Sequence, residues 1–297
     1  TFGQADTAIS PITVTANAGS LITAANDIRI KIATGTLDMR FDTADVTATV
    51  GGGASGKVSG TVSYEGGGSV LVIDVTSDFV TSDAITISGL SYKSFNAARG
   101  ATTTLALYIG GPADIVSDAV DNKTVAIQGV LVLGDHTLMQ VGDRFSQKTE
   151  NNRELFAFKL TAQGENMNVS SLVISLDPVF GIFTNDVTNV ALYKDINSNK
   201  AYDGGDVAVG GTGVVSITGG SGTITFSSAF SATGTTNYIM VGSTDLLGGD
   251  DGFNPNLITS NITVTGVTSL AAPQRLGFVM PAHHTKGGGA SGLTGGY

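Results

Sequence analysis

The chain has 297 residues and 41% apolar content, so it is long enough to bury one or two hydrophobic cores. Fifteen Lys and Arg residues against 25 Asp and Glu residues give a formal net charge of −10, and the cations form no basic run, which excludes the usual nucleic-acid-binding surface. Cys is absent, which excludes disulfides, thiolate metal sites and cysteine nucleophiles.

The start of the chain and its hydropathy bear on localisation. The sequence begins with Thr1 rather than Met, which is typical of a chain processed by removal of a signal peptide. No stretch approaches the roughly 18–20 apolar residues of a membrane span. We therefore expect an extracellular or cell-surface protein with no membrane span and no nucleic-acid partner.

Alternation of apolar and polar residues with a period of two dominates the first half of the chain and is typical of half-buried strands. The expected strands, separated by Gly, Asn and Asp, cover residues 48–50, 57–64, 69–75, 84–88, 104–109 and 124–127. These strands recur about every 8–15 residues, and this spacing predicts a β-sandwich or barrel. The pattern allows short helical turns near residues 95–98 and 114–119.

A boundary is expected near Gln128 and Gly129, after which a second series of strands begins. This series covers residues 130–133, 155–160, 172–176, 190–193, 214–217, 223–226, 238–241 and 262–267. Residues 281–297 are rich in Gly and lack a core-forming pattern. The sequence thus predicts two β-sandwich domains, residues 1–128 and 129–280, and a tail of residues 281–297.

Several segments of the first domain are distinctive, namely residues 22–30, 47–52, 62–65, 71–76 and 85–90. Together they resemble an immunoglobulin-like β-sandwich repeat of large bacterial surface and secreted proteins, over about residues 8–128. The resemblance implies stalks, adhesin modules or fibre building blocks without catalytic residues. The predicted fold class is therefore all-β, with two immunoglobulin-like β-sandwich domains in tandem and a Gly-rich C-terminal tail.

One motif, in residues 195–206, points to metal chemistry. Oxygen-bearing side chains stand at positions 1, 3, 5, 9 and 12 and a carbonyl at position 7, so the candidate ligands are Asp195, Asn197, Asn199, Ala201, Asp203 and Asp206. Ca²⁺ takes about six to eight oxygen ligands. The loop resembles the calcium loop of dockerins and EF-hands, except that Lys200 replaces the turn Gly and Asp206 replaces Glu.

Strands are expected on both sides of this loop, at residues 190–193 and 207–209. The sequence therefore predicts a β-hairpin loop held by a structural Ca²⁺, not a helix–loop–helix. The alternative is a polar turn without a metal, because Asp, Asn and Gly favour turns in any case. A second acidic loop, residues 245–251, matches no ligand spacing and is expected to be a solvated turn.

The sequence offers little for catalysis. The histidines are His136, in an expected turn, and the pair His283 and His284, expected to be exposed in the tail. No G-x-S-x-G elbow supports a Ser-His-Asp triad, and no glycine run matches a phosphate-binding motif. We expect no enzyme.

The ends of the chain carry candidate assembly residues. Residues 8–14 alternate, and Pro11 confines them to a sheet edge. This stretch either completes its own sandwich or is donated to the edge of the next subunit. The candidate assembly residues are Ile9, Ile12, Val14, Leu276, Phe278 and Tyr297.

The expected function is a structural subunit of an extracellular filament or surface assembly. Copies would polymerise head to tail by strand or tail exchange, a heterologous contact that gives an open filament when the rotation between copies does not close. The alternative is a calcium-dependent cell-surface adhesion or ligand-binding module, with surface glycans or host proteins as partners. A secreted hydrolase would require a cleft with converging acids.

Overall fold

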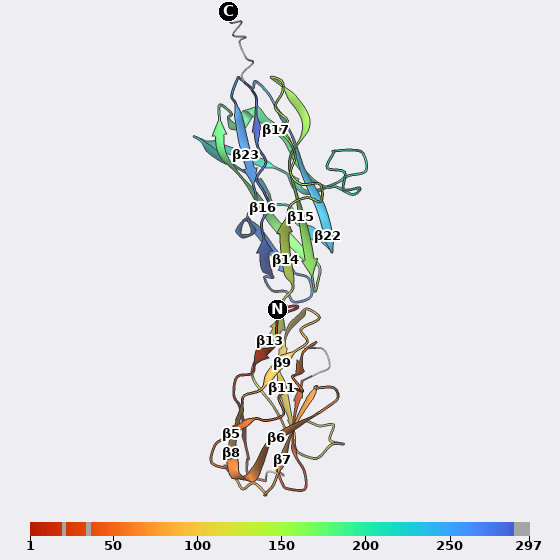
Figure 1. Cartoon of the computed structure of the whole chain (residues 1–297), viewed down its shortest axis with the longest axis vertical. Helices are drawn as coiled ribbons and strands as arrows, with labels where there is room; N and C mark the ends of the chain where they lie inside the picture. The colour runs from red at the N-terminus through yellow and green to blue at the C-terminus, as the bar shows by residue number, and fades with distance from the viewer. Residues whose placement is uncertain (20–21, 34–36, 288–297) are drawn as a thin grey trace, which may run out of the picture. The chain divides into compact units, whose positions relative to one another are not determined.

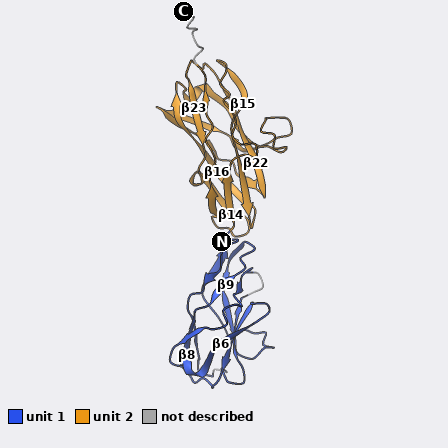
Figure 2. Cartoon of the chain, viewed as in Figure 1, with its two compact units in different colours: residues 1–128 blue, residues 129–297 orange. Residues whose placement is uncertain are grey.

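The computed structural model describes all residues except 20–21, 34–36 and 288–297 (Figure 1). The chain divides into two compact units, residues 1–128 and residues 129–297, which are coloured separately in Figure 2. Within the described residues, helix is limited to the 3₁₀ turns η1 (Ser55–Lys57), η2 (Thr184–Asp186) and η3 (Thr259–Asn261). The all-β prediction is therefore confirmed. No helix in the described part of the chain is long and apolar enough to cross a membrane.

Unit 1 is built from short strands. They are β1 (Thr7–Ala8), β2 (Ile12–Thr15), β3 (Ile28–Ile32), β4 (Arg40–Phe41), β5 (Thr49–Gly51), β6 (Val58–Glu65), β7 (Val70–Val75), β8 (Ala84–Ser88), β9 (Ser91–Lys93), β10 (Arg99–Thr103), β11 (Leu105–Tyr108), β12 (Ala119–Val120) and β13 (Thr124–Ile127).

Two sheets form the main layers of unit 1. A five-stranded sheet has the order β12-β11-β3-β7-β6, and a three-stranded sheet has the order β2-β8-β5. The pairings β1-β9-β4 and β10-β13 complete the unit. Ile28 and Ile73 from the first sheet and Ile87 from the second belong to one buried core, so the two sheets form a sandwich.

The period-two pattern explains which side chains reach this core. In β7, Leu71, Ile73 and Val75 are buried whereas Asp74 is exposed. Successive side chains of a strand point to opposite faces of the sheet, so these apolar residues share the face toward the core. The same alternation buries Ile85 in β8.

Unit 2 contains longer strands. They are β14 (Val130–Gly134), β15 (Glu150–Gln163), β16 (Met167–Phe180), β17 (Val187–Lys194), β18 (Val207–Thr212), β19 (Val214–Thr218), β20 (Ser221–Phe226), β21 (Phe230–Ala232), β22 (Thr235–Thr244), β23 (Gly252–Asn256), β24 (Ile262–Gly266), β25 (Gln274–Gly277) and β26 (His284–Thr285).

These strands also form a two-layered sandwich. One sheet has the order β18-β17-β22-β15-β14-β25, and the other has the order β19-β20-β16-β23-β26, with β21 and β24 also pairing with β16. Phe158 and Tyr238 from the first sheet and Phe226 from the second lie in one buried cluster. The rings of Phe158 and Tyr238 stack with centroids 5.3 Å apart. The strand β25 pairs in parallel with β14 and is the last strand at that edge of the first sheet in the described part of the chain.

The short helical turns that the pattern allowed near residues 95–98 and 114–119 do not form. Asp114 instead accepts hydrogen bonds from the backbone N–H groups of Gly110 (3.0 Å) and Val116 (3.1 Å). Asp118 accepts one from Ile109 N–H at 2.9 Å. Such local bonds from Asp side chains to the backbone compete with helix formation.

The predicted tail begins too early at residue 281. The strand β26 pairs with β23, and Ala282 is only 2% exposed within the core of unit 2. His284 is fully buried, contrary to the expected exposure. Its Nδ1 accepts a hydrogen bond from Arg144 N–H (3.1 Å), and its Nε2–H donates to the carbonyl of Leu155 (2.7 Å). These two bonds fix residues 282–285 to the sandwich.

Candidate functional site

The loop of residues 195–206 connects β17 to β18, which pair in antiparallel fashion with Lys194 opposite Val207. The predicted hairpin is therefore confirmed. Within the loop, polar side chains make a dense set of hydrogen bonds. The amide nitrogens Nδ2 of Asn197 and Asn199 both donate to Oδ2 of Asp203, at 2.8 and 3.0 Å.

The remaining predicted ligands also bond to backbone groups of the loop. The Asp206 carboxylate accepts from Ile196 N–H (3.2 Å) and Asp203 N–H (3.1 Å). Ala201 N–H donates to Oδ1 of Asn199 at 2.8 Å. The hydrogen bonds from Asn197, Asn199 and Gly205 hold the pKa of Asp203 below its usual value, with the Gly205 N–H contributing most.

Asp195, at the first position of the motif, is buried with a fully covered side chain. Its Oδ1 accepts from Asn199 N–H (3.1 Å), and its Oδ2 accepts from Lys200 N–H (2.7 Å). The Nε2 atom of His136 lies 2.8 Å from the same Oδ2. The sequence placed His136 in a turn and did not connect it with the loop.

Lys200 stands where an EF-hand loop has its turn Gly. The residue adopts φ 61°, the left-handed conformation that Gly reaches without steric cost. Its Nζ donates to the carbonyls of Leu138 and Gln140, both at 2.8 Å. The sharp turn is therefore kept despite the substitution, and the loop is fastened to residues 138–140.

The loop supplies the type of donor atom that Ca²⁺ prefers, but its side chains are not arranged as a set of ligands around one point. Its donors are hard oxygens of the kind Ca²⁺ prefers. In the described part of the chain, however, no three His, Cys, Asp or Glu side chains are grouped so that they would hold a metal. The amide nitrogens of Asn197 and Asn199 face Asp203, so both amide groups would have to turn over to present oxygen to an ion. Calcium binding stays a prediction.

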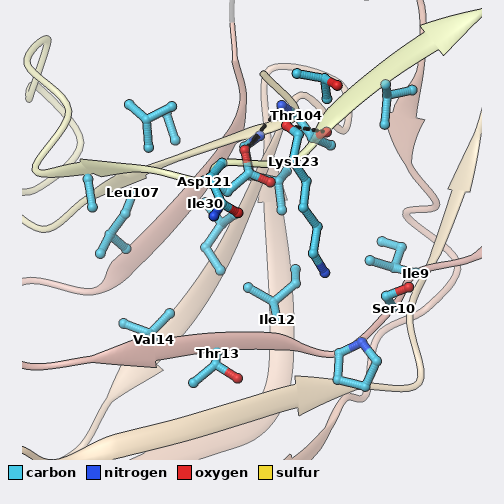
Figure 3. Close-up of a pocket in the computed structure, with 18 of the residues that line it drawn as sticks. Ile9, Ser10, Ile12, Thr13, Val14, Ile30, Thr104, Leu107, Asp121 and Lys123 are labelled. Carbon is cyan, nitrogen blue, oxygen red and sulfur yellow. Dashed lines mark hydrogen bonds between the residues drawn. The ribbon is translucent and has the colours of Figure 1, made fainter. Parts of the chain in front are cut away.

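Unit 1 contains an open apolar cleft of about 540 Å³ between the two layers of its sandwich. One wall is β2 with the residues before it, and the other is formed by β11, β12 and β13. Figure 3 shows Ile12 and Val14 on the side of β2 that faces Ile30 and Leu107, with Thr13 on the other side. Lys123 extends into the space between the walls (Figure 3).

The wall that β11, β12 and β13 form is held together by a carboxylate. Asp121 accepts from the backbone N–H groups of Thr104 (3.2 Å) and Leu105 (3.0 Å), and Thr104 donates its hydroxyl to the carbonyl of Lys123 (3.3 Å; Figure 3). These bonds join β11 to the segment between β12 and β13. The cleft could not be foreseen from the sequence, because its walls come from residues about a hundred positions apart.

Among the residues that the structure describes, the strand β2 is the edge of its sheet and pairs only with β8. Ala16 N–H donates to the carbonyl of Asp83 at 2.8 Å, so the even-numbered residues at this end turn their backbone groups toward β8. The backbone N–H and C=O groups of Thr13 and Thr15 point away from β8, because successive residues of a strand alternate in direction. The N-terminal stretch with Ile12 and Val14 thus completes its own sandwich, the first of the two outcomes that the sequence allowed, and it offers a free edge.

The C-terminal assembly candidates lie in unit 2. Leu276 belongs to the edge strand β25 and is 43% exposed, and Phe278 just after it is 73% exposed. Tyr297 lies outside the described residues. Ile9 precedes β2 and lines the cleft of unit 1.

Comparisons with known proteins give little support beyond this geometry. No family model and no curated protein matches the chain. Among solved structures, CaCohA2 from Clostridium acetobutylicum is 10% identical with a TM-score of 0.25, covering 55% of this chain and 93% of its own. The C-terminal domain of the AgI/II polypeptide BspA from Streptococcus agalactiae is 11% identical with a TM-score of 0.25, and the match covers 92% of this chain and 91% of the BspA chain.

The serine-rich repeat adhesion glycoprotein Srr1 from Streptococcus agalactiae is 11% identical with a TM-score of 0.24, covering 93% of this chain and 86% of its own. At TM-scores this low, none of these likenesses supports a conclusion about what this chain does. The features of the chain that bear on function are the cleft of unit 1 and the loop of unit 2.

Proposed function

We propose that the protein is a non-enzymatic structural subunit of an extracellular filament or surface assembly. The observation that supports this is the cleft of unit 1, which combines apolar walls with the free edge of β2. A free edge presents unpaired backbone N–H and C=O groups that another extended segment can bond. Side chains of an added strand would alternate into the cleft, the usual mode of strand addition.

The proposed occupant is residues 288–297 of a second copy. This segment lies outside the described residues and contains Leu293 and Tyr297 but no charged side chain. Extended, its ten residues span about 33 Å, more than a short strand such as β2. Leu293 and Tyr297 are four positions apart, so they would lie on one face of a strand and enter an apolar cleft together.

Negative-stain electron microscopy and sedimentation of the purified full chain test this proposal. We expect ordered polymers from the parent protein and none from a chain lacking residues 288–297. This deletion spares Ala282 and His284, which belong to the fold of unit 2. A peptide of residues 288–297 added in excess should also block assembly, because it competes for the same cleft.

A matched pair of variants tests the edge of β2. Thr13→Pro removes a backbone donor that faces away from β8, a position where an edge strand tolerates Pro. Thr13→Ala keeps the donor and serves as the control. We expect only Thr13→Pro to stop assembly, with the unfolding temperature of both variants near that of the parent. Monomers of the parent protein under every condition, or unchanged polymers of folded Thr13→Pro, would contradict the proposal.

We also infer that Ca²⁺ binds to the loop of residues 195–206 in a structural role. The support is its oxygen-rich spacing and the left-handed turn kept at Lys200. A bound ion would stabilise the folded state by RT ln(1 + c/Kd), which increases with the free Ca²⁺ concentration c. Calorimetric titration of the full chain with Ca²⁺ should give one site, lost in Asp203→Asn and kept in a control, Asp6→Asn. No heat of binding in the parent would overturn this assignment.

The alternative function, calcium-dependent adhesion, has one observation in its favour. The same loop exposes Ile196 (60%) and Tyr202 (40%), whose apolar surfaces would suit contact with a partner. The ring of Tyr202 is braced against Tyr193 with centroids 4.6 Å apart. A monomer that binds glycans or host proteins only with Ca²⁺ would favour this function over assembly.

A further inference from the structure

An apolar loop tip projects from unit 1 between β11 and β12. Ile115 is 90% exposed and Val116 is 70% exposed, which is unusual for adjacent large aliphatic residues. The loop is braced, because Asp114 accepts from Gly110 N–H (3.0 Å) and Val116 N–H (3.1 Å). We call residues 110–118 the knob. Its apolar tip is flanked by the carboxylates of Asp114 and Asp118.

Unit 2 has a shallow hollow of about 470 Å³ beside its open edge strand β25. The hollow is lined by Leu133, Met139, Phe278 and Lys159 among others. Met139 is 56% exposed and Phe278 is 73% exposed, so the apolar lining is open to solvent. At Gly277, φ is 84° and an added Cβ would collide with the carbonyl of Leu133. The lining of the hollow therefore has no side chain at this position.

The charges around the hollow suit an acidic partner. Lys159 lines it, and the Nζ of Lys200 is held nearby on the carbonyls of Leu138 and Gln140. The carboxylate of Asp135 also lines the hollow, but it accepts Met280 N–H at 2.7 Å. Cations beside an exposed apolar hollow are notable in a chain with net charge −10.

The geometry points to a second contact between copies, in which the knob of one copy seats Ile115 in the hollow of another. The apolar tip would meet the apolar lining, and Asp114 or Asp118 would lie near Lys159. This contact joins two different surfaces, so it is heterologous and links successive copies into a ring or an open polymer. The inference rests on the proposed self-assembly and names a surface other than the cleft.

Single engineered cysteines test the contact cleanly because the chain contains no Cys. A chain carrying Ile115→Cys is mixed with a chain carrying Phe278→Cys under mild oxidation, and the mixed disulfide dimer is quantified. The matched control replaces Phe278→Cys with Phe183→Cys, since Phe183 is 71% exposed on the same unit. We expect the Phe278 pair to cross-link about tenfold faster than the control, as effective concentration rises in a specific contact.

A charge reversal gives a second arm. Lys159→Glu should slow cross-linking of the Ile115 and Phe278 pair and leave that of the control pair unchanged. Equal rates for both pairs would overturn the inference, as would insensitivity to Lys159→Glu in a folded chain. The experiment is repeated in chains lacking residues 288–297. Specific cross-linking that persists in these shortened chains supports the knob contact even if the cleft proposal fails. Polymers that form without specific cross-linking refute the knob contact and leave the cleft proposal standing.

Discussion

His136 and Asp195 form a buried pair, with Nε2 of the histidine 2.8 Å from Oδ2 of the aspartate. The other ring nitrogen, Nδ1, accepts a hydrogen bond from Leu138 N–H at 3.0 Å. Nδ1 must therefore be unprotonated, and Nε2 carries the hydrogen donated to Asp195. The pair joins the turn after β14 to the first residue of the 195–206 loop.

Acidification should destabilise the protein through His136. Burial lowers the pKa of its imidazole, and Lys200 and Lys159 act in the same direction, against the opposing effect of Asp195. The unfolded chain therefore takes up the proton first, so this contribution to stability is complete above about pH 6.5 and is lost as the pH falls through the folded-state pKa. His284 behaves alike, since burial lowers its pKa as well.

Thermal unfolding of the full chain between pH 8 and pH 5 checks this expectation. His136→Asn should flatten part of the pH dependence, since it removes the titrating group and leaves a polar side chain. His283→Asn is the control, because His283 is exposed. An unchanged pH dependence in folded His136→Asn would contradict the prediction.

The left-handed conformation of Lys200 should affect the stability of the protein whether or not a metal is bound. A non-Gly residue in this conformation costs about 1–2 kcal/mol, while Gly costs about 0.4–1 kcal/mol more than other residues to order on folding. Lys200→Gly should therefore be more stable than Lys200→Ala by about 1 kcal/mol, since both lose the bonds to Leu138 and Gln140. Urea unfolding with a chelator measures the difference. A Lys200→Ala variant more stable than Lys200→Gly by about 0.4–1 kcal/mol would show that the turn is unstrained.

The sequence predicted those strands whose side chains alternate between core and solvent. The predicted strand at residues 84–88 coincides with β8, and that at 124–127 coincides with β13. It missed β25, because all four of its residues are exposed and only backbone pairing with β14 makes it a strand. Hydrophobic periodicity reports burial of side chains, whereas it carries no information on backbone pairing to a distant strand.

The two candidate sites differ in how far apart their residues lie in the sequence. The hairpin loop was predictable because its donors lie within twelve consecutive residues. The cleft was not, because Ile12 and Leu107 come to line one space only when the two layers of unit 1 assemble. The partner of Asp195 was also hidden, since His136 lies 59 positions away and only the fold brings the two together.

Glu150 gives a prediction for the opposite end of the pH range. Its side chain is 1% exposed, and burial opposes its ionisation. Hydrogen bonds from Arg153, Ser146 and Gln147 outweigh burial and lower the pKa of its carboxyl to about 2. Oε1 accepts from Ser146 N–H (2.9 Å) and Gln147 N–H (2.8 Å), and Oε2 accepts from Arg153 Nε (2.9 Å).

Because the folded-state pKa lies below the unfolded one, Glu150 stabilises the fold above about pH 4.5, and this is lost as the pH falls toward 2. Glu150→Gln should cost about 1–3 kcal/mol at neutral pH, since the amide cannot replace a carboxylate for all of these donors. The variant should also lose less stability than the parent between pH 4.5 and pH 2. Asp74→Asn, on the exposed face of β7, is the control. Urea unfolding across this pH range measures the stability of each variant. If stability falls with pH equally in the parent and in Glu150→Gln, the carboxylate does not anchor residues 146–147.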